Sequence, residues 1–144
     1  MGGGVMSQKR IPPAVWRYIE YELYSYDQTK KDLELLREEI LHGTPPPEEG
    51  HSSGPGNPTE SKGMRLISSP VIVRLERIVS AIERTIGQLT EDHSQLFTLK
   101  YIQGKHWRIV CQEMPTSERT YFRLRRDIVE LVAEKIGLAQ IWQE

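Results

Sequence analysis

Three residues that interrupt helices, Gly104, Pro115 and Gly137, divide the last third of this 144-residue chain and restrict how it can fold. Glycine takes the left-handed conformation that ends many helices. Proline cannot continue a helix, because it lacks an amide hydrogen and its ring clashes with the preceding turn. The positions of these residues predict helices over 91–102, 106–114 and 117–136. Two short helices followed by a longer one are therefore expected.

Apolar residues recur at helical spacing within these three segments, so each helix has one face suited to a core. The residues expected to point inward are Leu96, Leu99, Tyr101 or Ile102, Trp107, Val110, Cys111, Tyr121, Leu124, Ile128, Leu131 and Val132. The hydroxyls of Thr90 and Ser117 suit them to cap the first and the longest helix. A short helix, a turn and a longer helix are the layout of a helix-turn-helix, which we place at 91–138.

The N-terminal part, residues 12–41, also has helical spacing. The pattern weakens around residues 25–29, where Asp27 is suited to cap a new helix, so we expect either a kink or two helices. Apolar residues recur every seven positions here, at Ile19, Tyr26, Leu33 and Ile40. That spacing suits a helix pair, within one chain or between subunits.

Residues 42–63 contain five prolines, five glycines and no large apolar side chain. Such a segment cannot bury enough surface to offset its conformational entropy, which predicts a flexible linker. After it, Ser69 and Pro70 are suited to begin another helix. We therefore expect an all-α chain with a disordered N-terminus at 1–11, a helix or helix pair at 12–41, this linker, and a helical domain at 64–144.

Four arginines fall within eight residues of the longest predicted helix, at Arg119, Arg123, Arg125 and Arg126. Arginine donates paired hydrogen bonds to phosphate and to guanine O6 and N7. Arg119 and Arg123 are four residues apart near the helix start, which makes them candidates to contact base edges. Arg125 and Arg126 better suit the flanking phosphates. The alternative is a solvated charged face on an ordinary helix, but the preceding short helix and turn favour contact with DNA.

The start of the shorter helix is a second candidate contact. Backbone amides there can bind a phosphate, with Lys105 or Arg108 in support. His106 belongs to this group, although an ordinary surface histidine is an equal alternative. On the longer helix, Glu118 can accept a hydrogen bond from cytosine or stabilise the helix N-terminus. Phe122 falls outside the apolar stripe, on the side of the arginines.

The composition limits the other classes of function. The net charge of −1 gives no global signature of nucleic-acid binding, so any DNA contact must be local. The single Cys111 excludes an internal disulfide. The sequence has no glycine-rich phosphate loop and no Cys/His metal spacing, so we expect no enzyme, no metal and no cofactor. It also lacks the roughly 20 consecutive apolar residues needed to cross a bilayer.

The C-terminal motifs resemble region 4 of sigma factors and, more closely, the RinA-like phage transcriptional activators, a group similar to the ArpU regulators. The motifs that carry the resemblance are Y-I at 101–102, V-C at 110–111, S-E-R-T at 117–120, R-L-R-R at 123–126 and A-E-K-I-G at 133–137. L-E-L-L-R-E-E-I at 33–40 and A-I-E-R-T-I at 81–86 extend it over most of the chain.

This resemblance implies a role in phage or prophage gene control, in the cytoplasm of a bacterial host, and typically the activation of late or packaging operons. The start of the family's DNA-reading helix corresponds to Ser117, Glu118, Arg119, Thr120 and Arg123. The chain departs from the family at 114–116, where Met-Pro-Thr replaces the usual glycine or large apolar residue before the capping serine.

Three partners follow as expectations: double-stranded DNA, a second copy of the chain, and RNA polymerase. A dimer is expected because one short module binds DNA weakly. Trp16 and the N-terminal tyrosines suit an oligomer contact or an ordinary small core equally well. Two other functions stay open. One is a small terminase subunit, which would form a ring of eight or more subunits. The other is an interaction protein whose arginine face binds an acidic partner.

Overall fold

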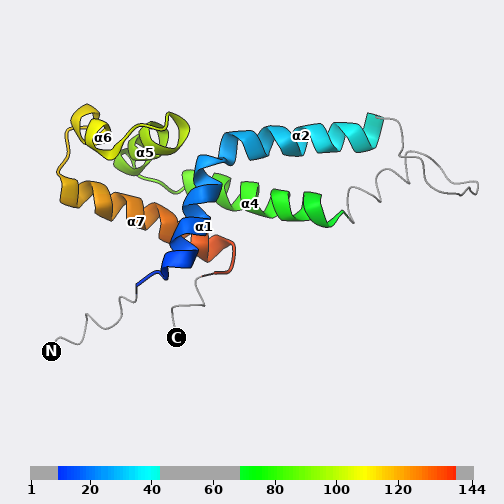
Figure 1. Cartoon of the computed structure of the whole chain (residues 1–144), viewed down its shortest axis with the longest axis horizontal. Helices are drawn as coiled ribbons and strands as arrows, with labels where there is room; N and C mark the ends of the chain where they lie inside the picture. Colours follow the sequence, from blue (N-terminus) through cyan, green and yellow to red (C-terminus); the bar gives the residue numbers. More distant parts are fainter. Residues whose placement is uncertain (1–9, 43–68, 139–144) are drawn as a thin grey trace, which may run out of the picture. The chain divides into compact units, whose positions relative to one another are not determined.

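The computed structural model describes residues 10–42 and 69–138, and every regular element in these two stretches is helical (Figure 1). The elements are α1 (Pro13–Tyr24), α2 (Tyr26–His42), α4 (Pro70–Ile86), α5 (Glu91–Phe97), η2 (Thr98–Ile102), α6 (Trp107–Glu113) and α7 (Glu118–Lys135). The predicted all-α class is confirmed. No helix of the described stretches has the length and apolarity that crossing a membrane requires.

The helices form two compact units. The first unit contains residues 10–26 and 80–138, and the second contains residues 27–42 and 69–79. Within the first unit, helix α1 packs on α7 and η2. The predicted N-terminal disorder, most of the predicted linker and the last six residues lie outside the described residues.

The break expected at residues 25–29 separates α1 from α2 at Ser25. The Ser25 amide donates to the Tyr21 carbonyl oxygen at 3.0 Å, which completes the last turn of α1. Asp27, expected as a cap, lies inside the first turn of α2, where its charge still opposes the helix dipole favourably. The N-terminal segment is therefore a pair of helices.

The second unit consists of α2 and the first part of α4. Leu33 of α2 and Ile72 of α4 are buried. Arg37 forms an ion pair with Glu76 across the two helices. Ser69 accepts a hydrogen bond from the Ile72 amide at 3.3 Å, so it caps α4 as expected.

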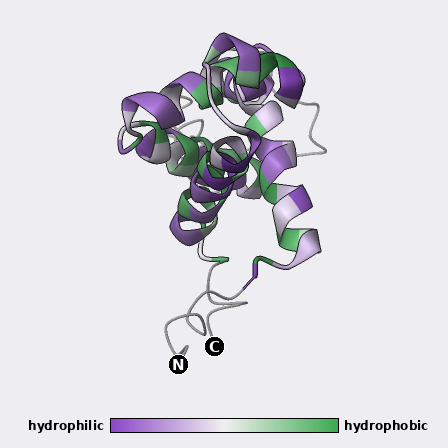
Figure 2. Cartoon of the chain, turned by 90° about the vertical axis from the view of Figure 1, so that its left-hand side faces the viewer, coloured by the Kyte–Doolittle hydropathy of each residue, from purple (hydrophilic) through white to green (hydrophobic). Residues whose placement is uncertain are grey.

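The first unit has its core where α5, η2 and α7 meet α1 and the end of α4. Its buried residues with almost no exposed surface include Ile19, Leu23, Ile82, Leu96, Val110, Tyr121, Leu124, Ile128, Val129 and Val132. Polar contacts hold the rim, where His93 Nε2 lies 3.0 Å from Asp127 Oδ2 and Tyr26 donates to Glu83 at 2.7 Å. Figure 2 shows that the helices carry hydrophobic and hydrophilic residues on different faces.

The segment predicted as one regular helix over 91–102 changes its pitch in the last turn. Helix α5 ends at Phe97 and continues as the π-helix η2, in which the Gln103 amide donates to the Thr98 carbonyl oxygen at 2.9 Å. The wider turn carries one extra residue, so a regular period does not predict which side chains face inward. Tyr101 is buried and Ile102 is exposed.

The three predicted breaks are confirmed. Gly104 and Gly137 have positive φ values of 68° and 84°, in the left-handed region that glycine favours. Helix α6 ends at Glu113, one residue before the buried Met114, and Pro115 lies in the turn that follows. Ser117 caps α7 through a 3.1 Å hydrogen bond from the Thr120 amide.

The Ser117 cap makes a testable contribution to stability. Ser117→Ala leaves an amide of the first turn of α7 without its partner, and we expect the free energy of unfolding to fall by about 1 kcal/mol. Ser117→Asn should keep most of the wild-type stability, because asparagine caps equally well. Urea unfolding followed by circular dichroism measures both variants, and equal stability of all three chains would contradict the role of this cap.

Candidate nucleic-acid interface

The candidate interface is built by α6, the turn after it and the first turns of α7. Val110 and Met114 are buried on the inner side of α6. The Trp107 ring lies against two rings of α7, with centroid distances of 6.3 Å to Tyr121 and 5.8 Å to Phe122. These aromatic contacts fix the start of α7 against the start of α6, which is the arrangement that a helix-turn-helix requires.

Arg119 and Arg123 lie on one exposed face of α7, four residues apart. Neither side chain has a hydrogen bond or an ion pair within residues 10–42 and 69–138. Arg119 lies in the first turn of α7, two residues after the capping Ser117. Two guanidinium groups are therefore presented to solvent near the N-terminal end of a helix.

The other two arginines of the cluster have partners inside the chain. Arg126 lies 3.5 Å from Glu130, one turn further along α7, and is partly exposed. Arg125 points to α1, where its Nε and Nη2 donate to the two oxygens of Glu20 at 2.8 and 2.7 Å. Its guanidinium also lies over the Trp16 ring, 4.7 Å from the centroid. The sequence-predicted cluster is thus divided between a solvent-facing side and an inner side.

The remaining predicted residues of α7 surround this face. Glu118 is exposed in the first turn, and Thr120 bonds Ser117 through both its amide and its hydroxyl, the latter at 3.0 Å. Phe122 is 39% exposed, which is unusual for a ring of this size. The Phe122 ring lies 5.8 Å from the Trp107 ring and 5.8 Å from the Arg125 guanidinium.

The three residues predicted at the start of α6 lie close together there, and each of them contacts a neighbouring residue of the same chain segment. Lys105 donates to both oxygens of Glu113 at 2.7 Å. The His106 ring accepts from the Arg108 amide at 3.2 Å, so His106 caps the helix. Arg108 lies over the Trp107 ring at 5.3 Å from its centroid. The Arg108 amide, one of those expected to bind a phosphate, is therefore already hydrogen-bonded to His106.

No group of three or more His, Cys, Asp or Glu side chains in the described stretches is arranged to hold a metal ion. Cationic and aromatic side chains predominate in the candidate interface, beside Glu118 and Thr120. Its chemistry is that of binding to anions and to planar rings.

Comparison with known proteins gives one informative match. The chain is 30% identical over 126 residues to the transcriptional activator rinA of Staphylococcus phage phi11, and the match covers 84% of this chain and 89% of that protein. The chain belongs to the RinA family. The resemblance to the RinA-like activators noted in the sequence is thereby confirmed. No protein-family model matches the chain, and no solved structure matches it.

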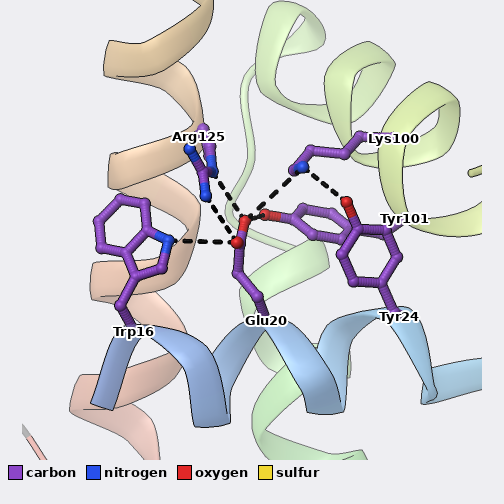
Figure 3. A network of polar contacts seen from close by, with 6 residues as sticks. All are labelled: Trp16, Glu20, Tyr24, Lys100, Tyr101 and Arg125. Carbon is purple, nitrogen blue, oxygen red and sulfur yellow. Dashed lines mark hydrogen bonds and ion pairs between the residues drawn. The ribbon is translucent and has the colours of Figure 1, made fainter. Parts of the chain in front are cut away.

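In this RinA-family chain, the network behind the arginine face is centred on Glu20 (Figure 3). Besides Arg125, the carboxylate accepts hydrogen bonds from Tyr101 at 2.6 Å and from Trp16 at 3.1 Å. Lys100 lies 3.8 Å from it. Glu20 thus connects α1, η2 and α7.

The protonation of this network follows from its surroundings. Burial acts to raise the pKa of Glu20, but the hydrogen bonds from Arg125 and Tyr101 and the charge of Lys100 outweigh it, so the pKa lies below its ordinary value. Burial, with the charge of Glu20, raises the pKa of Tyr101 well above its ordinary value. The hydrogen bond to Glu20 raises the pKa of Arg125. Glu20 is therefore ionised and Tyr101 neutral at neutral pH.

Sequence reasoning did not find Glu20 or Lys100 as parts of a site. Glu20 and Arg125 are 105 residues apart, and no local pattern joins them. One signal was present. Trp16 and Glu20 are four residues apart, so they share a face of α1 with the apolar stripe rather than with the solvent side.

The Glu20 network predicts a specific dependence of stability on pH. Glu20→Gln leaves Arg125 without its carboxylate, and we expect a loss on the order of 2 kcal/mol at pH 7. We place this below the loss from a fully buried pair, because the Arg125 side chain is 23% exposed.

The sign follows from the lowered pKa of Glu20. The stabilisation is fully present above pH 4.5, the ordinary pKa, and is lost as the pH falls through the folded-state pKa. Unfolding free energies of wild type and Glu20→Gln should therefore converge below about pH 4.5. Urea unfolding at several pH values measures this, and a difference that stays constant down to pH 2.5 would contradict it.

Proposed function

We propose that the chain is a DNA-binding transcription activator of phage genes that reads DNA with the N-terminal half of α7. The observation that carries the proposal is the pair Arg119 and Arg123, exposed on one face at the start of a capped helix that packs on a shorter helix. The role of the phi11 relative, named a transcriptional activator, supports activation rather than DNA packaging.

In the proposed complex, Arg119 and Arg123 contact base edges in the major groove, and Glu118 and Thr120 lie beside them. Arg126 and Arg108 contact the flanking phosphates. Lys105 can join them if it exchanges Glu113 for a phosphate. Arg125 is left out of this surface, because Glu20 already accepts its paired donors. Its role in the proposal is to fix α7 against α1.

The separation of exposed arginines from the buried Arg125 explains how a chain of net charge −1 can bind DNA. The positive charge at the start of α7 is local, and a phosphate backbone responds to local charge within roughly 10 Å at ordinary ionic strength. We propose a homodimer, because a second copy doubles the contacts on a two-fold repeated site. RNA polymerase is the second proposed partner, since activation requires that transcription responds to the bound protein.

Substitution of the exposed arginines tests the assignment of base contacts. Arg119→Ala and Arg123→Ala should each weaken binding to the target site by about 1–3 kcal/mol and relax its sequence preference, with a smaller effect on random DNA. Arg84→Ala, which removes an exposed arginine from the last turn of α4, is the matched control. Footprinting on the phage genome defines the site, and fluorescence anisotropy measures the affinities. Equal losses on target and random DNA would show that neither arginine reads bases.

Arg126 and Arg125 should differ in the salt dependence of binding. Arg126→Ala removes one proposed phosphate contact, so the slope of log K against log salt should fall by about 0.9 and all sequences should bind more weakly. Arg125→Ala should leave that slope unchanged while lowering the thermal midpoint of the protein. A reduced slope in Arg125→Ala, measured well below its midpoint, would place Arg125 on the DNA instead.

A further inference from the structure

A pocket opens beside the arginine face, between the end of α1, η2 and the first turns of α6 and α7, with a volume of about 380 Å³. Its walls include four aromatic rings, those of Tyr24, Trp107, Tyr121 and Phe122. Lys100 and Arg125 are the least exposed of the lysines and arginines that line it. We call it the aromatic pocket. Its volume lies in the lower part of the range of small-molecule sites, roughly 300–1,000 Å³.

The charges around the aromatic pocket do not balance. Three cations line it, Lys100, Lys105 and Arg125, and their ion-pair partners are two carboxylates, Glu20 and Glu113. Lys105 and Glu113 neutralise each other at 2.7 Å. One positive charge therefore remains among the other three groups.

That charge resides on Lys100. A carboxylate offers about four lone-pair sites. Those of Glu20 are occupied by two donors of Arg125, by Tyr101 and by Trp16, at 2.6–3.1 Å. Lys100 remains 3.8 Å away from Glu20 and hydrogen-bonds hydroxyls instead, that of Tyr24 at 2.7 Å (Figure 3) and that of Tyr121.

Lys100 is also poorly solvated, since only 7% of the residue is exposed. Its ammonium lies over the rings of Tyr24 and Tyr101, 5.0 and 5.1 Å from their centroids, which replaces part of its hydration. A buried ammonium that shares its one carboxylate with an arginine is only partly compensated, and an anion in the pocket would add to that compensation.

The remaining walls favour a ligand with a planar ring. The Phe122 and Trp107 rings pack against each other, with centroids 5.8 Å apart and planes tilted by 46°, and both are at least partly exposed, so together they form one aromatic wall of the pocket. Offset or tilted stacking on such rings is favourable for a flat group. We propose that the aromatic pocket binds a small anion that carries one planar ring, with the anionic group toward Lys100 and the ring against Trp107 and Phe122.

The proposal is tested with the full chain and without DNA, so that its failure is distinct from a failure of the proposed DNA contacts. Isothermal titration calorimetry is performed with two probes, deoxyadenosine monophosphate and indole-3-acetate. Deoxyadenosine supplies the ring without the charge, and inorganic phosphate supplies the charge without the ring. At least one probe should bind about tenfold more tightly than both comparators, which is about 1.4 kcal/mol. Binding of neither probe would overturn the proposal.

Variants then locate the site. Lys100→Met should weaken the bound probe about tenfold, whereas Lys31→Met, on the exposed side of α2, should not. Circular dichroism monitors folding. If Lys100→Met does not fold, Phe122→Ala is used instead, because Phe122 is 39% exposed and its substitution should leave the fold intact. Loss of this ring should lower the affinity for the probe severalfold. Unchanged affinity in a folded Lys100→Met variant or in Phe122→Ala would overturn the proposal.

The same chemistry has a second source, since DNA itself carries phosphates and rings. A random duplex at saturating concentration is therefore added to the chain with its bound probe. We expect the probe to stay bound, which identifies the aromatic pocket as a site separate from the DNA surface. Stoichiometric displacement of the probe would assign the aromatic pocket to DNA and overturn the proposal of a separate ligand.

Discussion

The position of α7 depends on one carboxylate. Glu20 extends from α1 and accepts hydrogen bonds from Arg125 of α7 and from Tyr101 of η2, so three elements that are distant in sequence meet at a single charged group. Apolar packing alone is non-directional, and it allows helices to slide or rotate by small amounts. A bidentate ion pair with fixed geometry restricts that freedom. The side of α7 that faces solvent is set by the side that Glu20 holds.

The Glu20 network also determines which arginines of the cluster at 119–126 remain unpaired on the surface. Four arginines so close together would repel one another and leave their orientation undefined. The pairing of Arg125 with Glu20 removes one charge from the surface, and Glu130 lies close to a second at Arg126. Arg119 and Arg123 remain as a well-defined pair on one face. A chain of low net charge can in this way present a small cationic surface without a large positive field over the whole molecule.

Local patterns in the sequence predicted the helices and their ends. Gly104, Pro115, Ser117 and Gly137 act through the backbone of their own neighbourhood, so their effect is visible without the rest of the chain. The apolar stripe of α7 was predictable for the same reason, since its inner residues follow one helical period. The phage-activator resemblance was also contained in short motifs.

Other features could not be found in this way. Nothing near Arg125 in the sequence distinguishes it from Arg123, and only the distant Glu20 makes them different. The inward position of Tyr101 rather than Ile102 depends on the π turn, which no period of 3.6 describes. The pocket beside α7 brings together Tyr24 and Phe122, which are nearly a hundred residues apart. These properties arise from tertiary contacts, and a single sequence does not encode them in any local pattern.

The π turn at η2 has a consequence for how this chain and its relatives can be compared. A π turn is equivalent to one residue inserted into an α-helix, so the side chains before and after it differ in register by about 100° from a regular helix. Removal of one residue between Thr98 and Ile102 would restore a regular helix and turn Lys100 and Tyr101 away from Glu20. A relative that lacks one residue at this place in an alignment would therefore lack the π turn. Its contact with α1 would have to be made without the Glu20 network. The length of η2, more than the identity of its residues, records whether the carboxylate network is present.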